Sequence, residues 1–194
     1  MQLRPPTKVQ VPWRPPEVLA HQLAHQWGEA GLIWLDGDGS TLGRWATLAA
    51  DPIEQHCCRG GPDNPDAGNP FATLRDLGPG HWCGWLGYEA AAWTEPGNPW
   101  KPDGMASLWI AKHDPILRLD LIERKLWIEG QDLKRLKRME AWLEGIGEIS
   151  VAHPPTVCIP AGQWHWHTKR ADFADGVRSI QALIAAGDLF QANL

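Results

Sequence analysis

Three polar side chains near the C-terminus, Asp188, Gln191 and Asn193, are of types that take part in acid–base chemistry and hydrogen bonding. They follow Gly187 in a short segment with no other acid or base. General acid–base catalysis requires paired groups that converge on one reacting atom. The sequence offers no such constellation, so we expect Asp188 to cap or support the adjacent helix and no catalytic residue in this chain.

A metal site is the next possibility, because Cys158 precedes His165 and His167. Their spacing matches no standard zinc site, and only one cysteine is available there. Cys57 and Cys58 are adjacent, and in a strand they point to opposite faces, which suits neither a disulfide nor a shared metal. We therefore expect no metal site among these residues and free thiols, as is usual in the cytosol.

The apolar periodicity predicts the elements that must position these groups. Helices are expected at 16–27, 70–77 and 133–146, and a fourth carries an apolar stripe from Phe173 to Ile184 and ends at Gly187. Strands are expected at 31–36, 45–50 and 81–93, with two more between about 108 and 128, broken at 114–115 and 121–124. Residues 189–194 alternate like the opening of a half-buried strand.

The domain organisation follows from this order of elements. We predict an N-terminal domain over 1–150, a Pro-rich linker over 151–167 and the start of a second domain over 168–194. The last segment has a helix and a strand without the surfaces they are patterned to cover, so we expect that domain to be incomplete and the chain to be a fragment. Strands clustered between a few helices, without strict alternation, favour an α+β fold.

The composition is that of a globular protein without a basic surface. Hydrophobic residues make up 43% and charged residues 21%, and 18 Lys and Arg against 23 Asp and Glu give a formal charge of −5. We expect no nucleic-acid partner, and we assign the local basic cluster Lys134–Arg138 to the solvated side of a helix. No apolar run has membrane-spanning length and the start lacks a signal-peptide core, so we expect a cytoplasmic protein without a membrane partner.

Aromatic usage is unusual, with 13 Trp against 1 Tyr and 3 Phe. Several of these tryptophans lie in runs that are typical of strands, where a large ring packs well on a pleated face. We expect them to fill the core rather than to stack on a ligand. They are Trp34, Trp45, Trp85, Trp109 and Trp127.

Three motifs resemble one enzyme family, that of aminodeoxychorismate synthase component I and anthranilate synthase component I. The C-terminal motif resembles the start of the family's chorismate-binding domain. Upstream, Leu42–Trp45 with Ala50–Pro52 resembles the family's "LGR(Y/W)S…ADP" strand pair, and Gly84–Glu89 resembles its "GxLGYE" strand. The residues that match at the C-terminus are Ile184, Ala186, Gly187, Asp188, Phe190, Gln191, Asn193 and Leu194.

The resemblance implies the N-terminal part of a large antiparallel two-sheet sandwich flanked by helices. It implies chorismate as substrate, Mg²⁺ as cofactor and ammonia delivered by a glutamine amidotransferase component II, or its fused equivalent. In the family, Mg²⁺ offsets the charge of the chorismate carboxylate and assists the leaving hydroxyl. The family's Mg²⁺ ligands and catalytic residues follow the matched motif, so we expect none here, with Gly187, Asp188, Gln191 and Asn193 near the catalytic cleft.

The branch of the family is a separate prediction. The Leu-Asp-Gly turn and the Gln-Ala-Asn-Leu segment favour aminodeoxychorismate synthase component I, which makes 4-amino-4-deoxychorismate for p-aminobenzoate and folate synthesis. The alternatives are anthranilate synthase component I, which serves tryptophan synthesis, and a non-catalytic stand-alone N-terminal module.

The turn at Asp36 and Gly37 bears on that choice. The regulated anthranilate enzymes carry Leu-Glu-Ser at the position that resembles Leu35–Gly37, and the serine helps bind tryptophan as a feedback inhibitor. Glycine has no side-chain donor or acceptor, so a tryptophan ligand would lose one partner here. We expect a degraded effector pocket that does not bind tryptophan, in a turn whose residues serve backbone geometry.

Overall fold

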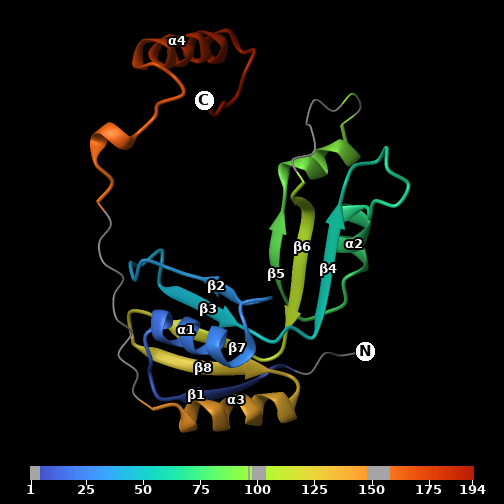
Figure 1. The fold of residues 1–194 in the computed structure, drawn as a ribbon, viewed down its shortest axis with the longest axis vertical. Coiled ribbons are helices and arrows are strands. Elements are labelled where there is room, and N and C mark those ends of the chain that lie inside the picture. The colour runs from blue at the N-terminus through green and yellow to red at the C-terminus, as the bar shows by residue number, and fades with distance from the viewer. Residues whose placement is uncertain (1–4, 96, 98–103, 148–157) are drawn as a thin grey trace. The chain divides into compact units, whose positions relative to one another are not determined.

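The computed structural model describes residues 5–95, 97, 104–147 and 158–194, which form helices and two β-sheets (Figure 1). The chain divides into two compact units, Met1–Val151 and Ala152–Leu194. Among the described residues, every strand belongs to the first unit. Within the described ranges, no helix is both long enough and apolar enough to cross a membrane.

The larger sheet has five antiparallel strands in the order β1-β8-β7-β3-β2. The smaller sheet has three antiparallel strands in the order β4-β6-β5. The strands of the larger sheet are β1 (Thr7–Val11), β2 (Ile33–Leu35), β3 (Trp45–Ala49), β7 (Ile116–Asp120) and β8 (Lys125–Gly130). Those of the smaller sheet are β4 (Glu54–Arg59), β5 (His81–Leu86) and β6 (Ala106–His113).

Helices flank the two sheets. Two of them, α1 (Pro16–Trp27) and α3 (Leu133–Gly145), pack on the larger sheet, and α2 (Pro70–Asp76) lies by β4 of the smaller sheet (Figure 1). The Asn69 side chain caps α2, and the Asp132 side chain caps α3 by accepting two backbone N–H groups. The remaining helical elements are the 3₁₀ turns η1 (Tyr88–Trp93) and η2 (Ala161–Gln163) and the long helix α4 (Arg170–Ala186).

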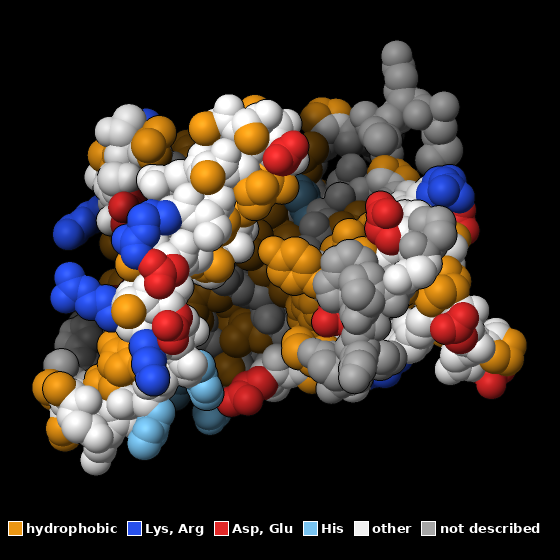
Figure 2. Space-filling view, turned by 90° about the horizontal axis from the view of Figure 1, so that it is seen from above, with side chains coloured by type: hydrophobic (Ala, Val, Ile, Leu, Met, Phe, Trp, Pro, Cys, Tyr) orange, Lys and Arg blue, Asp and Glu red, His pale blue; other side chains and the backbone are white. Residues whose placement is uncertain are grey.

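Tryptophan rings do not fill the core as the sequence predicted. None of the described tryptophans is fully buried: Trp45 and Trp85 are 46% and 47% exposed, and Trp85 stacks on Trp109 with ring centroids 4.9 Å apart. Trp45 and Trp127 lie on the face of the larger sheet that points away from α1 and α3. By contrast, Trp13, Trp27 and Trp142 are half-buried against the main core. On the face viewed in Figure 2, hydrophobic side chains are exposed between Lys, Arg, Asp and Glu side chains that are interspersed with one another.

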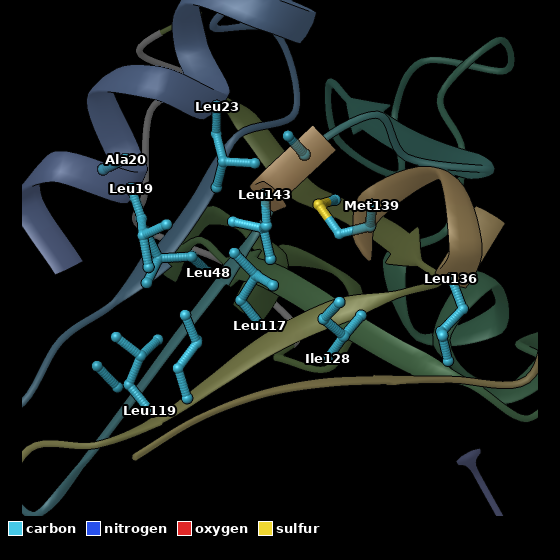
Figure 3. Packing of buried hydrophobic residues seen from close by; sticks show 13 residues of the cluster. Leu19, Ala20, Leu23, Leu48, Leu117, Leu119, Ile128, Leu136, Met139 and Leu143 are labelled. Atoms are coloured by element: carbon cyan, nitrogen blue, oxygen red, sulfur yellow. The ribbon is translucent and has the colours of Figure 1, made fainter. Parts of the chain in front are cut away.

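The main core is aliphatic and lies between the larger sheet and its two helices (Figure 3). Side chains alternate along each strand, so one face of β3, β7 and β8 carries the leucines and isoleucine that α1 and α3 cover. Branched aliphatic side chains fill this layer without leaving polar atoms to satisfy. The central members are Leu19, Leu23, Leu48, Leu117, Leu119, Leu126, Ile128, Leu136, Met139 and Leu143.

The chain passes between the two sheets twice, at residues 50–53 and at Asp114–Pro115. Arg135 of α3 holds both crossings, because its guanidinium donates to the carbonyl oxygens of Asp114 and Asp51 and lies 3.0 Å from the Asp51 carboxylate. Beside the crossings, Ile33, Ala49 and Ile116 of the larger sheet pack against the smaller sheet. The prediction that Arg135 lies on a solvated helix face is therefore wrong.

The α+β prediction with two antiparallel sheets and flanking helices is confirmed, and the four predicted helices form close to their expected bounds. Four details differ. Residues 88–93 form a 3₁₀ helix instead of continuing β5, and residues 189–194 form no strand within the described part of the chain. Two strands form that the sequence did not predict, β1 in the Pro-rich start and β4 over Glu54–Arg59. Residues 151–157 of the predicted linker lie outside the described residues, whereas 158–167 are described and contain the 3₁₀ turn η2.

Candidate functional site

The turn between β2 and β3 is built on two glycines in close contact. A Cβ atom at Gly37 would lie 2.2 Å from the carbonyl oxygen of Gly43, and one at Gly43 would lie 2.1 Å from Asp38 Oδ1. The Gly39 N–H donates to the Gly43 carbonyl over 2.9 Å, and the Ser40 N–H donates to Asp38 Oδ1 over 2.9 Å. Hydrogen bonds from the Ser40 side chain and then from the Ser40 backbone N–H lower the pKa of the Asp38 carboxyl. Close contacts inside the turn thus account for both glycines, with the Gly43 backbone in the case of Gly37 and with the Asp38 side chain and backbone N–H in the case of Gly43.

This geometry bears on the predicted effector pocket at Asp36 and Gly37. Asp36 is exposed where β2 ends, and Gly37 faces the opposite side of its own turn. A serine side chain at residue 37 would overlap the Gly43 backbone, so the turn must move to accommodate a hydroxyl there. The prediction that tryptophan does not bind at this turn stays a prediction, but it now has a steric reason as well as a missing hydrogen bond.

The neighbouring Arg44 has a structural partner. Its guanidinium Nε donates to both oxygens of Asp120, over 3.0 and 2.9 Å, and the Asp120 side chain is only 2% exposed. The same carboxylate accepts the backbone N–H groups of Ile122 and Glu123. The hydrogen bond from Arg44 is the main cause that lowers the pKa of Asp120 to about 2. Arg44 therefore fixes the Leu-Gly-Arg-Trp segment to the β7–β8 hairpin.

The Gly-Trp-Leu-Gly-Tyr-Glu segment has a similar architectural role. A Cβ atom at Gly84 would lie 2.0 Å from the carbonyl oxygen of Trp109, so glycine lets β5 lie close against β6. Strand β5 ends at Leu86, and the chain then turns into η1. Tyr88 points into solvent with 83% of its surface exposed.

At the C-terminus, Gly187 ends α4 as the sequence predicted. Its φ of 84° is left-handed, its N–H donates to Ile184, and the Asp188 N–H donates to Leu183 over 3.0 Å. Asp188 thus closes the helix through its backbone. Beyond it, Gln191 and Asn193 are exposed.

The predicted site residues therefore fall into two groups on different units. Asp36 and Gly37 belong to Met1–Val151, whereas Gly187, Asp188, Gln191 and Asn193 belong to Ala152–Leu194. Neither group includes a pair of acid–base side chains in hydrogen-bond contact within the described residues. The described contacts of these residues shape the β2–β3 turn and the C-terminal end of α4, and they do not by themselves indicate a reaction.

Comparison with known proteins identifies the family of this chain. Residues 23–194 match the family described as chorismate binding enzyme. This match spans well over half of the chain. The protein belongs to the chorismate binding enzyme family. A curated relative, the "Anthranilate synthase component I-like protein" of Synechocystis sp. (strain ATCC 27184 / PCC 6803 / Kazusa), is 29% identical over 120 residues. Those residues make up 59% of this chain and only 23% of the relative.

The described residues contain no group of three or more His, Cys, Asp and Glu side chains that could hold a metal ion. Magnesium prefers carboxylate oxygens in a near-octahedral arrangement, and the described acidic residues do not provide that arrangement. These residues therefore do not fit the Mg²⁺ that the family resemblance implies.

Sequence reasoning missed the polar contacts of Arg44, Asp120 and Arg135, which link distant segments of the first unit. Nothing in the local pattern distinguishes Arg135 from Lys134 or Lys137, because its partners lie 21 and 84 residues away. Asp120 has a weak signal, since a carboxylate at a strand end before a tight turn often accepts the N–H groups of that turn. Its long-range partner Arg44, 76 residues away, has none.

Proposed function

We propose that this chain is the N-terminal part of an aminodeoxychorismate synthase component I, which aminates chorismate to 4-amino-4-deoxychorismate. The observation that carries the proposal is the family match over residues 23–194. It is supported by the motifs that this match includes, since the Gly43–Arg44 and Gly84 segments have defined places in the two-sheet fold. The chain spans 23% of the length of the curated relative, so the activity belongs to a larger assembly of residues.

The turn at Gly37 favours the aminodeoxychorismate branch. A Cβ atom there would lie 2.2 Å from the Gly43 carbonyl oxygen, so this turn has no place for the serine that the regulated anthranilate enzymes use to bind tryptophan. An enzyme of folate synthesis has no need for feedback inhibition by tryptophan, whereas a regulated enzyme of tryptophan synthesis does. The substitution is therefore easier to reconcile with the first branch.

The proposed activity includes a cofactor and a partner. Mg²⁺ would supply Lewis-acid assistance at the chorismate carboxylate and the leaving hydroxyl, through ligands outside the residues described. A glutamine amidotransferase, as a separate component II or a fused equivalent, would supply ammonia. The part of the chain described would then contribute sheets, turns and the α4 segment to the enzyme, without an acid–base residue of its own.

A product assay tests this proposal. The protein encoded by the complete natural reading frame is incubated with chorismate, ammonium and Mg²⁺, and products are separated by liquid chromatography with mass detection. We expect 4-amino-4-deoxychorismate without release of pyruvate. Chorismate that remains unaminated at every enzyme concentration would overturn the proposal and favour the stand-alone module. The 194-residue chain, assayed in parallel, should give no product above a control without protein.

Anthranilate synthase component I is a second candidate, because the printed name of the Synechocystis relative points to it. The same assay separates the two, since this branch releases one pyruvate for each anthranilate formed. A coupled pyruvate assay that matches anthranilate fluorescence in amount would favour this second candidate. Tight binding of tryptophan to the same protein would favour it further.

A further inference from the structure

Helix α1 carries two histidines one turn apart in the sequence His-Gln-Leu-Ala-His. His21 and His25 are both exposed, and they line one cavity of about 160 Å³ together with Gln22, Gln26, Trp142 and Ile146. Side chains at positions i and i+4 of a helix lie on the same face, with Cβ atoms about 5–6 Å apart. The two imidazoles are therefore neighbours at the mouth of one cavity.

The backbone under these histidines is firmly held. Leu19 and Leu23 on the opposite side of α1 are fully buried in the main core. One turn further on, the ring of Trp27 meets that of Trp142 edge to face, with centroids 4.6 Å apart. Because α1 and α3 are both packed on the core, the two histidines lie on a rigid helix, which favours metal coordination.

The far wall of the cavity is held in place as well. Arg14 precedes α1, and its guanidinium donates to the carbonyl oxygens of Leu143, over 3.0 Å, and Ile146, over 2.7 Å, at the end of α3. The guanidinium charge is thus engaged by the α3 carbonyl groups. The cavity is in this way bounded by two helices whose separation is fixed by packing and hydrogen bonds.

We propose that His21 and His25 bind one late first-row divalent metal ion, of the class Ni²⁺, Cu²⁺ or Zn²⁺, through one ring nitrogen each. Imidazole is a preferred ligand of these ions, and two histidines four residues apart on a helix are an established way to chelate them. The described residues offer no third His, Cys, Asp or Glu in a cluster, so water fills the remaining positions. This site is distinct from the Mg²⁺ of the proposed function, which prefers oxygen ligands.

The residue after His21 decides what such an ion can do. In zinc proteases of the His-Glu-x-x-His type, the glutamate between the ligands is the general base. Here that place is taken by Gln22, whose amide cannot accept a proton and whose side chain is only 4% exposed. The site is therefore assigned metal binding without hydrolysis, in a structural or sensing capacity.

Calorimetric titration of the whole chain with NiCl₂ tests the proposal. The exposed thiols of Cys57 and Cys158 are first replaced in a Cys57→Ser/Cys158→Ser background, because thiolates also bind these ions. We expect saturable binding of one Ni²⁺ per chain and no heat with MgCl₂. His21→Ala and His25→Ala should each weaken Ni²⁺ binding at least about tenfold, because each removes one of two ligands.

The chain offers a matched control and a second readout. His165→Ala/His167→Ala removes the other closely spaced histidine pair and should leave Ni²⁺ binding unchanged. Ni²⁺ should also raise the midpoint of thermal unfolding, because the two imidazoles are held together only in the folded helix. That rise should disappear in His21→Ala, with circular dichroism showing an intact fold. Absence of saturable binding, or binding that survives the α1 variants or follows His165 and His167, would overturn the proposal.

Discussion

Two amphipathic helices of this protein, α3 and α4, differ in how far their apolar side chains are buried. In α3, one stripe of side chains is almost fully buried, with Leu136, Met139 and Leu143 each 3–4% exposed. In α4, none of the residues is buried, and Phe173 and Ile184 are 48% and 42% exposed. The apolar spacing is similar in both. It therefore predicts the helix, but the burial of its stripe depends on the surface that another element supplies.

The comparison has an energetic consequence. Most of the stability of a helix in a folded protein comes from packing its apolar face, since an isolated helix of this length is marginal in water. Within the described residues, α3 has that packing and α4 does not. The free energy of unfolding should therefore be concentrated in the Met1–Val151 unit. The first experiment below compares the two units, and three more test contacts within the first unit.

The largest effect should come from the aliphatic core. Leu119→Ala removes a fully buried side chain and should lower the free energy of unfolding by about 2–5 kcal/mol. The matched change in α4, Ile184→Ala, should cost less than about 0.5 kcal/mol, because the side chain is 42% exposed. Urea unfolding followed by circular dichroism measures both. Equal losses of unfolding free energy in the two variants would mean that α4 is packed as tightly as the core of the first unit.

The next effect should come from the arginine that holds the two sheets together. Arg135→Met removes the hydrogen bonds to the carbonyl groups of Asp114 and Asp51 and should cost about 1–3 kcal/mol. Lys134→Met, on the exposed side of the same helix, provides the control and should change the free energy of unfolding very little. If both variants unfold at the same urea concentration, Arg135 does not connect the sheets energetically.

A third effect of about 1–3 kcal/mol should follow from Gly37→Ser, because the added side chain overlaps the Gly43 carbonyl group. Gly61→Ser makes the same chemical change where nothing lies within 4 Å of the new Cβ, and it should be nearly neutral. Calorimetric titration with tryptophan should give no heat with either variant. A stable Gly37→Ser protein that binds tryptophan would show that the turn adapts and would revive the effector pocket.

The smallest effect should be a dependence on pH. His113 is fully buried, and its Nε2 donates to the carbonyl oxygen of Gly31 over 2.8 Å. Burial is the main cause that lowers the pKa of His113 below 6.5. The unfolded chain then binds the proton more readily, so stability is complete above about pH 6.5 and falls as the pH drops below it, by at most about 1.4 kcal/mol per pH unit.

His113→Gln tests the sign of this dependence. The glutamine amide can still donate to Gly31 but does not titrate, so the fall in stability between about pH 6.5 and pH 5 should become shallower. The measurement is the urea midpoint at several pH values for both proteins. A fall of the same size in His113→Gln would assign it to other groups.

Much of the fold was accessible from the sequence because it rests on local signals. The helices begin and end near the predicted residues, since Asn69, Asp132 and Gly187 satisfy the backbone groups at helix ends within a few residues along the chain. By contrast, β1 was missed, because its ladder depends on β8, more than 100 residues away. The segment after Asp188 was predicted as a strand from its alternation, which gives a strand only where a partner supplies the ladder.

For the candidate site, too, local features could be predicted from the sequence and long-range contacts could not. The sequence by itself determined the family, through short motifs whose glycines are required by close contacts of the chain. It also determined the positions of the helices, through the period of apolar residues and through helix caps. The tertiary structure decided which side chains are buried, so leucines fill the core while Trp34, Trp45 and Trp85 of the sheets stay 43–47% exposed. It also decided that Arg44 and Arg135 serve as links between distant segments, because an ion pair or carbonyl contact depends on distance in space, which local sequence does not encode.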